Sequence, residues 1–121
     1  MPIVGDDPLM GALSKALSGL SARQRAIAQN LANIETPNYR ARTVSFEDSL
    51  RGALRSSDPA DLRQVQLSYD RSTDPVNQIG NNVQIEKETT GLEETSLRYQ
   101  MLSDAVSSRF RLLRTVMKRD V

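Results

Sequence analysis

The chain has 121 residues, the usual length of one domain, and its 16 basic and 15 acidic residues leave a net charge of +1. This balance provides no excess positive field to hold a phosphate backbone, which argues against a nucleic-acid partner. Cysteine and histidine are absent, which excludes a disulfide framework, the usual zinc sites, a thiol nucleophile and a histidine base.

The hydropathy of the chain leaves two explanations open. Apolar residues make up 38% and aromatic residues 4%, which is low for a compact domain. The chain is either an ordinary polar helical protein or an elongated subunit whose burial is completed by partners. Residues 1–7 are acidic where a signal peptide would be cationic. No run approaches the roughly 20 apolar residues of a membrane span, so the residues alone predict a cytosolic chain.

The first predicted element is a helix over residues 8–34. Pro8 suits its first turn, and Asp6 and Asp7 upstream are candidate caps. Apolar residues then recur at alternating steps of three and four, which is the seam of a coiled coil with one polar interruption at Gln24. The seam consists of Met10, Leu13, Leu17, Leu20, Gln24, Ile27, Leu31 and Ile34.

Small residues form a second stripe beside this seam. They are Ala12, Ala16, Gly19 and Ala26. Small side chains let another element approach closely, so the helix is expected to bury two faces. The alternative is that alanine occurs there only because it forms helices well. The helix should end before Thr36, because Pro37 disfavours helical geometry at the residue that precedes it.

Residues 35–82 are predicted to form a largely irregular connection. The stretch 44–55 has apolar residues four positions apart, as in a short amphipathic helix. Further on, Val65, Leu67 and Tyr69 alternate with polar residues, which predicts a short strand or extended segment. A connection of this length in a small protein is usually functional or disordered until bound. We therefore expect it to be mobile in the free chain.

The last predicted element is a long helix over residues 83–119, with Asn82 as its expected N-cap. Its heptad positions are Leu92, Tyr99, Val106 and Leu113. Glutamates crowd its amino half and arginines its carboxyl half, a distribution that complements the helix dipole. The alternative, that the basic end binds nucleic acid or a membrane, accounts less simply for the apolar residues between the cations. At 1.5 Å per residue the helix would be roughly 50 Å long.

No catalytic constellation emerges from the sequence. There is no glycine-rich phosphate loop and no nucleophile elbow. Glu93 and Glu94 are adjacent, so on a helix they point about 100° apart and do not converge on one substrate. Without histidine, a general base would have to be a carboxylate or a lysine in a pocket. The sequence predicts no enzyme, no cofactor, no metal site and no small-molecule substrate.

A specific motif closes the first helix. Residues 29–40 are Gln-Asn-Leu-Ala-Asn-Ile-Glu-Thr-Pro-Asn-Tyr-Arg. This motif resembles the amino-terminal signature of the bacterial flagellar basal-body rod and hook proteins, in which Asn-Leu-Ala-Asn is followed by a Thr-Pro turn, a glycine, an aromatic and a basic residue. Segments 80–83, 97–100 and 110–115 look like the carboxyl half of the short, proximal-rod branch of that family. The middle of the chain contributes nothing to the resemblance.

Two positions depart from the family pattern. Asn38 stands where glycine is common, and asparagine tolerates that position if the backbone there is left-handed. Gln84 stands where an acidic residue is usual. The first departure concerns the geometry of the turn, and neither overturns the resemblance.

The resemblance implies a structural subunit of the proximal rod, which crosses the periplasm and transmits motor torque. It implies export through the flagellar type III apparatus without a cleaved signal peptide, which reverses the cytosolic prediction. Expected partners are other copies of the chain, other rod proteins and the export apparatus at the base. The implied fold is a single all-α domain over residues 1–121, with the terminal helices paired as an antiparallel, coiled-coil-like core.

The candidate site residues fall into two groups. The family motif and candidate subunit contacts are Asn30, Leu31, Ala32, Asn33, Thr36, Pro37, Tyr39 and Arg40. The candidate helix-seam residues are Leu13, Leu17, Leu20, Ile27, Leu92, Tyr99, Val106 and Leu113. The amides of Asn30 and Asn33 can satisfy either the last carbonyls of their own helix or backbone groups of a neighbour. Tyr39 either packs locally or reaches a neighbour together with Arg40.

Two other functions compete with the rod subunit. A self-contained helical-hairpin or coiled-coil adaptor in the cytosol would explain the heptads but not the motif. A secretion chaperone would also be small and helical, but it would normally be acidic and would remain inside the cell.

Overall fold

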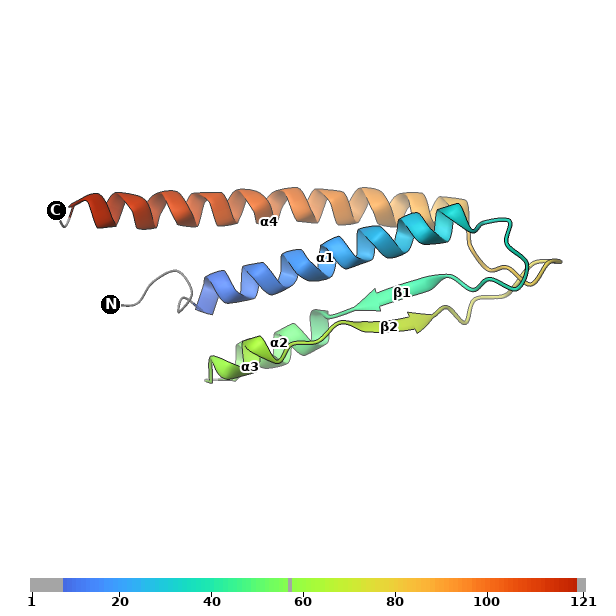
Figure 1. The fold of residues 1–121 in the computed structure, drawn as a ribbon, viewed down its shortest axis with the longest axis horizontal. Helices are drawn as coiled ribbons and strands as arrows, with labels where there is room; N and C mark the ends of the chain where they lie inside the picture. Colours follow the sequence, from blue (N-terminus) through green and yellow to red (C-terminus); the bar gives the residue numbers. More distant parts are fainter. Residues whose placement is uncertain (1–7, 57, 120–121) are drawn as a thin grey trace.

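A computed structural model describes residues 8–56 and 58–119. Its elements, in chain order, are α1 (Pro8–Ala32), β1 (Arg42–Ser45), α2 (Glu47–Arg55), α3 (Ala60–Arg63), β2 (Ser68–Arg71) and α4 (Ile85–Arg119). Figure 1 shows an elongated arrangement in which α4 lies along α1 and the chain runs in opposite directions in the two helices. The two strands lie on the other side of α1. The candidate caps Asp6 and Asp7 lie outside the described residues.

The two long terminal helices are confirmed, with shifted ends. α1 ends at Ala32, short of the predicted residue 34, because the chain turns before Pro37. α4 begins at Ile85, two residues later than predicted. The long helices thus agree with an all-α protein, but the middle segment adds a two-stranded sheet.

The middle segment, residues 35–82, contains two strands and two short helices, one strand and one helix more than expected, and its remaining residues are irregular. The expected amphipathic helix exists as α2, but it begins at Glu47, and Val44 lies instead in β1. Val44 is buried against α1 between exposed neighbours, the alternation of a strand with one covered face.

The strands pair antiparallel, with Arg42 opposite Arg71 and Ser45 opposite Ser68. β2 is exposed along its whole length. The strand expected around residue 67 begins later, at Ser68, because Leu67 packs against the larger core cluster instead of alternating in a sheet.

α1 buries two faces, as its second stripe predicted. One face lies against α4, and the small-residue face lies against β1, α2 and α3. The ring of Phe46 occupies the space above Gly19, where an added Cβ would lie 2.4 Å from a ring carbon. The larger cluster consists of Leu20, Ala22, Ala26, Val44 and Phe46, and the smaller one of Ala12, Ala53 and Leu62.

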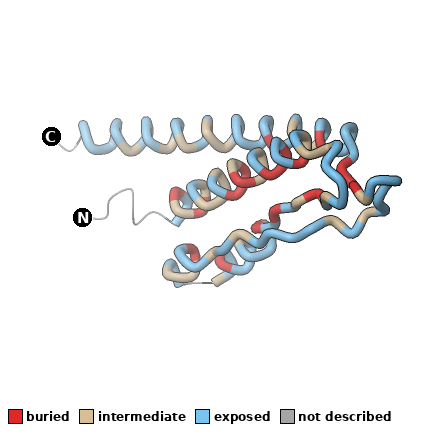
Figure 2. Tube along the Cα trace, turned by 45° about the vertical axis from the view of Figure 1, so that its right-hand side comes forward, coloured by how far each residue is buried: buried red, intermediate tan, exposed pale blue. Residues whose placement is uncertain are grey.

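α4 is covered by the rest of the chain mainly along its amino half. Figure 2 shows buried positions near that end and a largely exposed carboxyl half. Thr95 is 3% exposed, whereas the large apolar side chains of Leu97 and Met101 are each 62% exposed. Among the described helices, none combines the length and the apolar character that a membrane span requires.

Candidate functional site: the asparagine network

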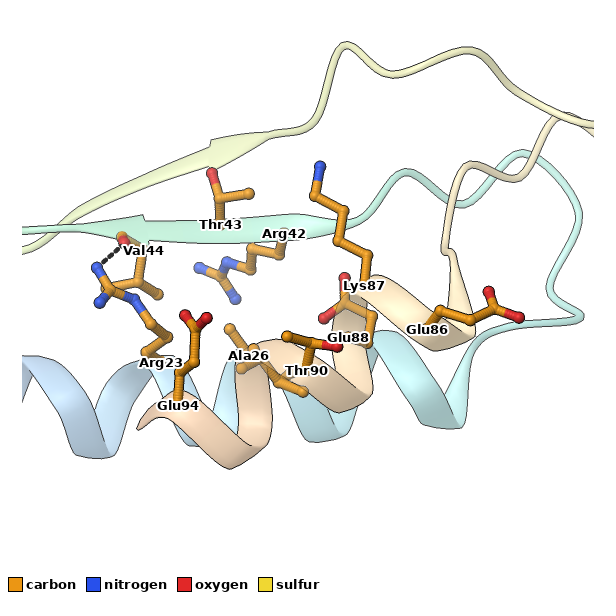
Figure 3. Close-up of a pocket in the computed structure, with 12 residues that line it drawn as sticks. Arg23, Ala26, Arg42, Thr43, Val44, Glu86, Lys87, Glu88, Thr90 and Glu94 are labelled. Atoms are coloured by element: carbon orange, nitrogen blue, oxygen red, sulfur yellow. Dashed lines mark hydrogen bonds between the residues drawn. The ribbon is translucent and has the colours of Figure 1, made fainter. Parts of the chain in front are cut away.

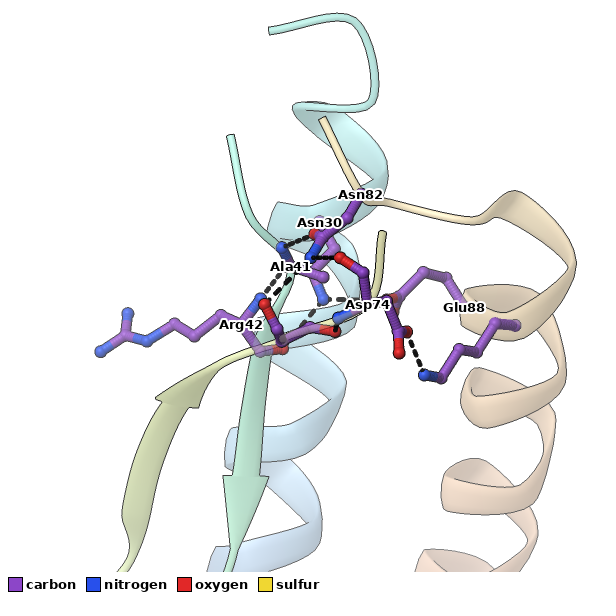
Figure 4. Close-up of polar contacts among 8 residues, drawn as sticks. Asn30, Ala41, Arg42, Asp74, Asn82 and Glu88 are labelled. Carbon is purple, nitrogen blue, oxygen red and sulfur yellow. Dashed lines mark hydrogen bonds and ion pairs between the residues drawn. The ribbon is translucent and has the colours of Figure 1, made fainter. Parts of the chain in front are cut away.

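Four asparagines meet where the end of α1, the approach to β1 and the start of α4 come together. We call Asn30, Asn33, Asn81 and Asn82 the asparagine network. Asn30 and Asn81 are each 1% exposed and Asn82 is 3% exposed. Figure 4 shows part of this network, with the bonds of Asn30 and Asn82 converging on the backbone that leads into β1. Buried amides of this kind must be hydrogen-bonded, or their desolvation destabilises the fold.

Asn30 joins three elements through its side chain. Its Oδ1 accepts hydrogen bonds from the Arg42 backbone N–H at 2.8 Å and from the Tyr39 hydroxyl at 3.1 Å. Its Nδ2 donates to the Arg42 carbonyl at 2.9 Å and to Glu88 Oε1 on α4 at 3.1 Å. These bonds use both donors and both acceptor sites of the amide. Asn30 therefore fixes α1 to β1 and to α4 within one chain.

Asn81 lies at the carboxyl end of the middle segment and binds the backbone of the turn that follows α1. Its Nδ2 donates to the carbonyls of Asn33 and Thr36, both at 2.9 Å, and its Oδ1 accepts from the Val83 backbone N–H at 2.8 Å. Asn33 makes a local contribution: its Nδ2 donates to the Gln29 carbonyl at 2.8 Å. These amides therefore give a second hydrogen bond to carbonyls of the last turn of α1 and of the turn that follows it, each of which also accepts from a backbone N–H.

Asn82 holds the middle segment instead of capping α4, so the N-cap prediction is wrong. Its Oδ1 accepts from the Ala41 backbone N–H at 2.6 Å, and its Nδ2 donates to the carbonyls of Ser72 at 3.0 Å and Asp74 at 3.1 Å. The side chain is committed to backbone groups before β1 and after β2, and α4 starts only at Ile85.

Two left-handed residues let the turns beside the network approach each other. Asn38 has φ 63°, the left-handed conformation that asparagine tolerates at this position, and Gly80 has φ 78°. The Asn38 backbone N–H donates to the Ile79 carbonyl at 2.8 Å. A Cβ on Gly80 would lie 2.5 Å from Asn38 Oδ1, so the close approach requires glycine at that position.

Glu88 is the ionisable member of the site, and it is only 9% exposed. Burial raises the pKa of its carboxyl above 4.5, and the hydrogen bond from Asn30 opposes this rise only in part. Neighbouring Lys87 is turned to Asp74, with Nζ 2.6 Å from Oδ2. This contact lowers the pKa of Asp74.

A groove of about 620 Å³ opens beside the network, between α1, β1 and the start of α4 (Figure 3). Its floor includes the small or apolar residues Ala26, Ile27 and Gly91. Its rim carries charges of both signs: Arg23, Arg42, Glu86, Lys87, Glu88 and Glu94. In the parts of the chain that the structure describes, no group of three or more acidic residues is placed to hold a metal ion.

Arg23 braces one end of the groove. Its guanidinium contacts Glu47 through two hydrogen bonds, at 2.7 and 2.8 Å, and donates to the Val44 carbonyl at 2.7 Å. It also lies over the ring of Phe46, 5.1 Å from the centroid. The hydrogen bond with Arg23 is the main cause that lowers the pKa of Glu47 to about 2.

The predicted motif residues divide between buried and exposed positions. Asn30 is buried, and Leu31, Asn33 and Tyr39 are half-buried. The exposed members are Ala32, Thr36, Pro37 and Arg40. The structure places Asn30 and Asn33 in one site with Asn81, Asn82 and Glu88, which the sequence analysis did not assign to that site. For Asn81 and Asn82 the signal in the sequence was the Asn-Asn dipeptide after Gly80, which predicted only a turn and an N-cap.

The predicted seam residues are covered unequally. Leu20 and Ile27 are buried, and Tyr99 is 36% exposed. The half-buried members are Leu13, Leu17, Leu92, Val106 and Leu113. At the polar interruption of the seam, Gln24 Nε2 donates to Ser96 Oγ on α4 at 3.3 Å.

Known proteins match this chain both over the motif and over most of its length. Residues 10–40, which include Asn30, Asn33 and Tyr39, match the family model described as flagella basal body rod protein. The chain is 35% identical over 115 residues to the flagellar basal body rod protein FlgB of Bacillus subtilis, covering 87% of this chain and 89% of that protein. It is 31% identical over 121 residues to FlgB of Borreliella burgdorferi, covering 84% and 90%. FlgB of Escherichia coli is 28% identical over 123 residues, covering 86% and 88%.

These matches and the long paired helices define a structural subunit of the flagellar basal-body rod. Within that class, the chain belongs to the FlgB family of flagellar basal body rod proteins.

Proposed function

We propose that the chain is a subunit of the proximal rod and that it transmits motor torque through helices packed against neighbouring subunits. The observation that carries this proposal is the unequal covering of α4. Its amino half is held by Asn30 and the core, whereas Leu97 and Met101 at its middle are each 62% exposed. Large apolar side chains left exposed side by side on one helix are typical of a surface that contacts a partner.

The proposed torque-transmitting unit is an antiparallel, coiled-coil-like pair of α1 and α4 within a single domain, residues 1–121. The opposite chain directions in Figure 1 and the Gln24–Ser96 hydrogen bond support it. The half-buried seam residues Leu13, Leu17 and Leu113 would become covered when neighbouring subunits pack around the pair.

In this proposal the motif has two roles. Asn30 and Asn33 close the chain on itself, because their amides are occupied by groups of the same chain. Thr36, Pro37 and Arg40 lie exposed at the turn beside the network. We propose that these three residues contact an adjacent subunit.

The proposed location is the periplasmic rod, reached through the flagellar type III export apparatus without cleavage of a signal peptide. The proposed partners are other copies of the chain, other rod proteins and the base of the basal body. The role is mechanical and uses neither catalysis nor a cofactor.

The test is deletion of the coding sequence in the bacterium that carries it. We expect non-motile cells whose isolated basal bodies lack a rod in electron micrographs, and recovery of both properties when the chain is supplied again. Normal rods in the deletion strain would contradict the proposal. Retention of the chain in the cytosol of rod-bearing cells would favour an adaptor or a secretion chaperone instead.

A further inference from the structure

A second apolar surface runs along α4, away from the face that contacts α1. We call it the outer face of α4; it comprises Leu97, Met101, Ala105, Ser108 and Leu112, which follow one another at steps of three and four. All five are exposed, with Leu97 and Met101 at 62% and Leu112 at 55%. In Figure 1 the side of α4 opposite α1 is open along its length.

Acidic residues flank the amino end of the outer face and basic residues its carboxyl end, with Arg98 and Asp104 between them. Glu93 and Glu94 lie at the amino end, and Arg111 and Arg114 lie at the carboxyl end. All four are exposed, and no salt bridge among the described residues involves any of them. Glu93 and Arg111 are about five helical turns apart, so they border the same side of the helix.

We propose that the outer face binds the outer face of a second copy, with the two α4 helices parallel and staggered by about 27 Å, five turns at 5.4 Å each. At this stagger Glu93 of one copy lies beside Arg111 of the next. Leu97 then enters the space between Leu112 and Val116, which is the knobs-into-holes contact of parallel helices. The amino half of the outer face therefore contacts one neighbouring copy, and the carboxyl half contacts another.

This inference rests on the proposed rod function, which requires a contact that repeats without closing. A parallel staggered contact is heterologous and propagates, whereas an antiparallel pair with the same charge matching is a closed dimer. The apolar side chains supply the attraction, because exposed ion pairs alone contribute little. The charges set direction and register, because a parallel contact without stagger places like charges together.

The absence of native cysteine allows a direct test on the purified full-length chain. Leu97→Cys/Thr115→Cys places thiols at the two ends of the proposed contact, on exposed positions five turns apart. Under mild oxidation at high protein concentration, the staggered contact produces a ladder of disulfide-linked oligomers. A closed antiparallel pair that places Glu93 opposite Arg111 keeps these thiols about 12 Å apart along the helix axis and leaves monomers. Either dimers only or monomers only overturns the inference.

Single-cysteine variants provide the controls. Met101→Cys lies next to the centre of the span from Glu93 to Arg111, where an antiparallel pair would bring two copies of the residue together. The staggered contact predicts no disulfide dimer for this variant. Thr89→Cys is exposed but off the outer face, and it should also remain monomeric. Circular dichroism identical to that of the unaltered chain shows that each variant keeps its fold.

Charge reversal tests the register independently. In the double-cysteine background, Glu93→Arg/Glu94→Arg and Arg111→Glu/Arg114→Glu should each slow disulfide formation about tenfold at low salt. A mixture of the two reversed chains should recover the rate, because each supplies the charge that the other lacks. Equal rates in all combinations would overturn the staggered register. If motility depends on the chain but no ladder forms, the rod function stands and this contact fails.

Discussion

Asn30 Nδ2 on α1 donates a hydrogen bond to Glu88 Oε1 on α4 at 3.1 Å, in a site where Asn30 is 1% exposed. The same amide binds both backbone polar groups of Arg42 at the start of β1. A single side chain thus joins the helical pair to the sheet. The network and the core cluster around Phe46 together hold the middle segment on α1.

Replacing Asn30 should strongly destabilise the chain. Asn30→Ala removes the partners of the Arg42 N–H, of the Tyr39 hydroxyl and of the Glu88 carboxylate at once. Leaving such groups buried without partners costs about 3 kcal/mol in total. Urea unfolding followed by circular dichroism measures the loss. The matched control is Gln29→Ala, whose side chain is exposed on the same turn and whose loss should change stability by less than about 0.5 kcal/mol. Equal stability of the two variants would contradict this role of Asn30.

Glu88→Gln should stabilise the chain at neutral pH. Burial raises the folded pKa of Glu88 above its ordinary 4.5, so the folded state favours the neutral carboxyl. Ionisation therefore costs stability above the folded pKa, and the cost vanishes below pH 4.5, where the carboxyl is protonated in both states. Gln keeps an oxygen to accept from Asn30 and carries no charge. Unfolding at pH 7 and pH 4 should show an advantage of the variant only at pH 7.

The exposed Glu94→Gln provides the comparison for Glu88→Gln, because it makes the same chemical change on the surface of the same helix. It should change stability by less than about 0.5 kcal/mol. An advantage of Glu88→Gln that persists undiminished at pH 4 would show that the effect does not come from ionisation.

Two glycine substitutions in helices should have opposite signs. Alanine forms helices better than glycine, by about 1 kcal/mol. At Gly19, however, the new Cβ would lie 2.4 Å from the Phe46 ring, and overpacking should destabilise Gly19→Ala by about 2 kcal/mol. At Gly52 no atom lies within 4 Å, so Gly52→Ala should stabilise the chain by about 0.5 kcal/mol. Thermal melts of both variants measure the difference, and two shifts of the same sign would refute this placement of Phe46.

The Arg23–Glu47 contact should weaken in acid. The folded pKa of Glu47 is about 2, below its ordinary 4.5, so its contribution is fully present above pH 4.5 and is lost as the pH falls through about 2. The Glu47 side chain is 42% exposed, and solvent screening limits the contribution to about 1 kcal/mol. Glu47→Gln should cost that amount at pH 6 and progressively less below pH 4.5. The exposed pair of Asp48 and Arg51 supplies the control, since Asp48→Asn should have no measurable effect.

Local patterns in the sequence predicted the parts of the fold that local forces determine. The heptads around Leu20 and Val106 identify two long helices, because helix formation depends on neighbours three and four residues away. At Asn38 the sequence left the turn geometry open, and the structure shows a left-handed residue. The small-residue stripe correctly indicated a second buried face on α1, although the sequence did not show that β1 and Phe46 would occupy it.

The remainder depends on partners that are distant in the chain. β1 and β2 are strands of four residues each, and Val44 is paired with Tyr69 across two intervening helices. Such short segments carry too little periodicity to reveal their pairing. Asn81 and Asn82 were missed as site residues because their side chains bind backbone carbonyls, and any residue type can supply a carbonyl. Their roles become visible only in three dimensions.

The role of the outer face of α4 in rod assembly is tested most directly by changing that face in the flagellum. Leu97→Glu/Met101→Glu places charges on two exposed apolar positions without touching the asparagine network. Thr89→Glu/Gln100→Glu adds the same charge to exposed polar positions of the same helix. In basal bodies isolated from cells that carry only one of these variants, we predict no rods for the first and complete rods for the second, with both purified chains equally helical. Complete rods built from the first variant would show that the rod does not need the outer face of α4.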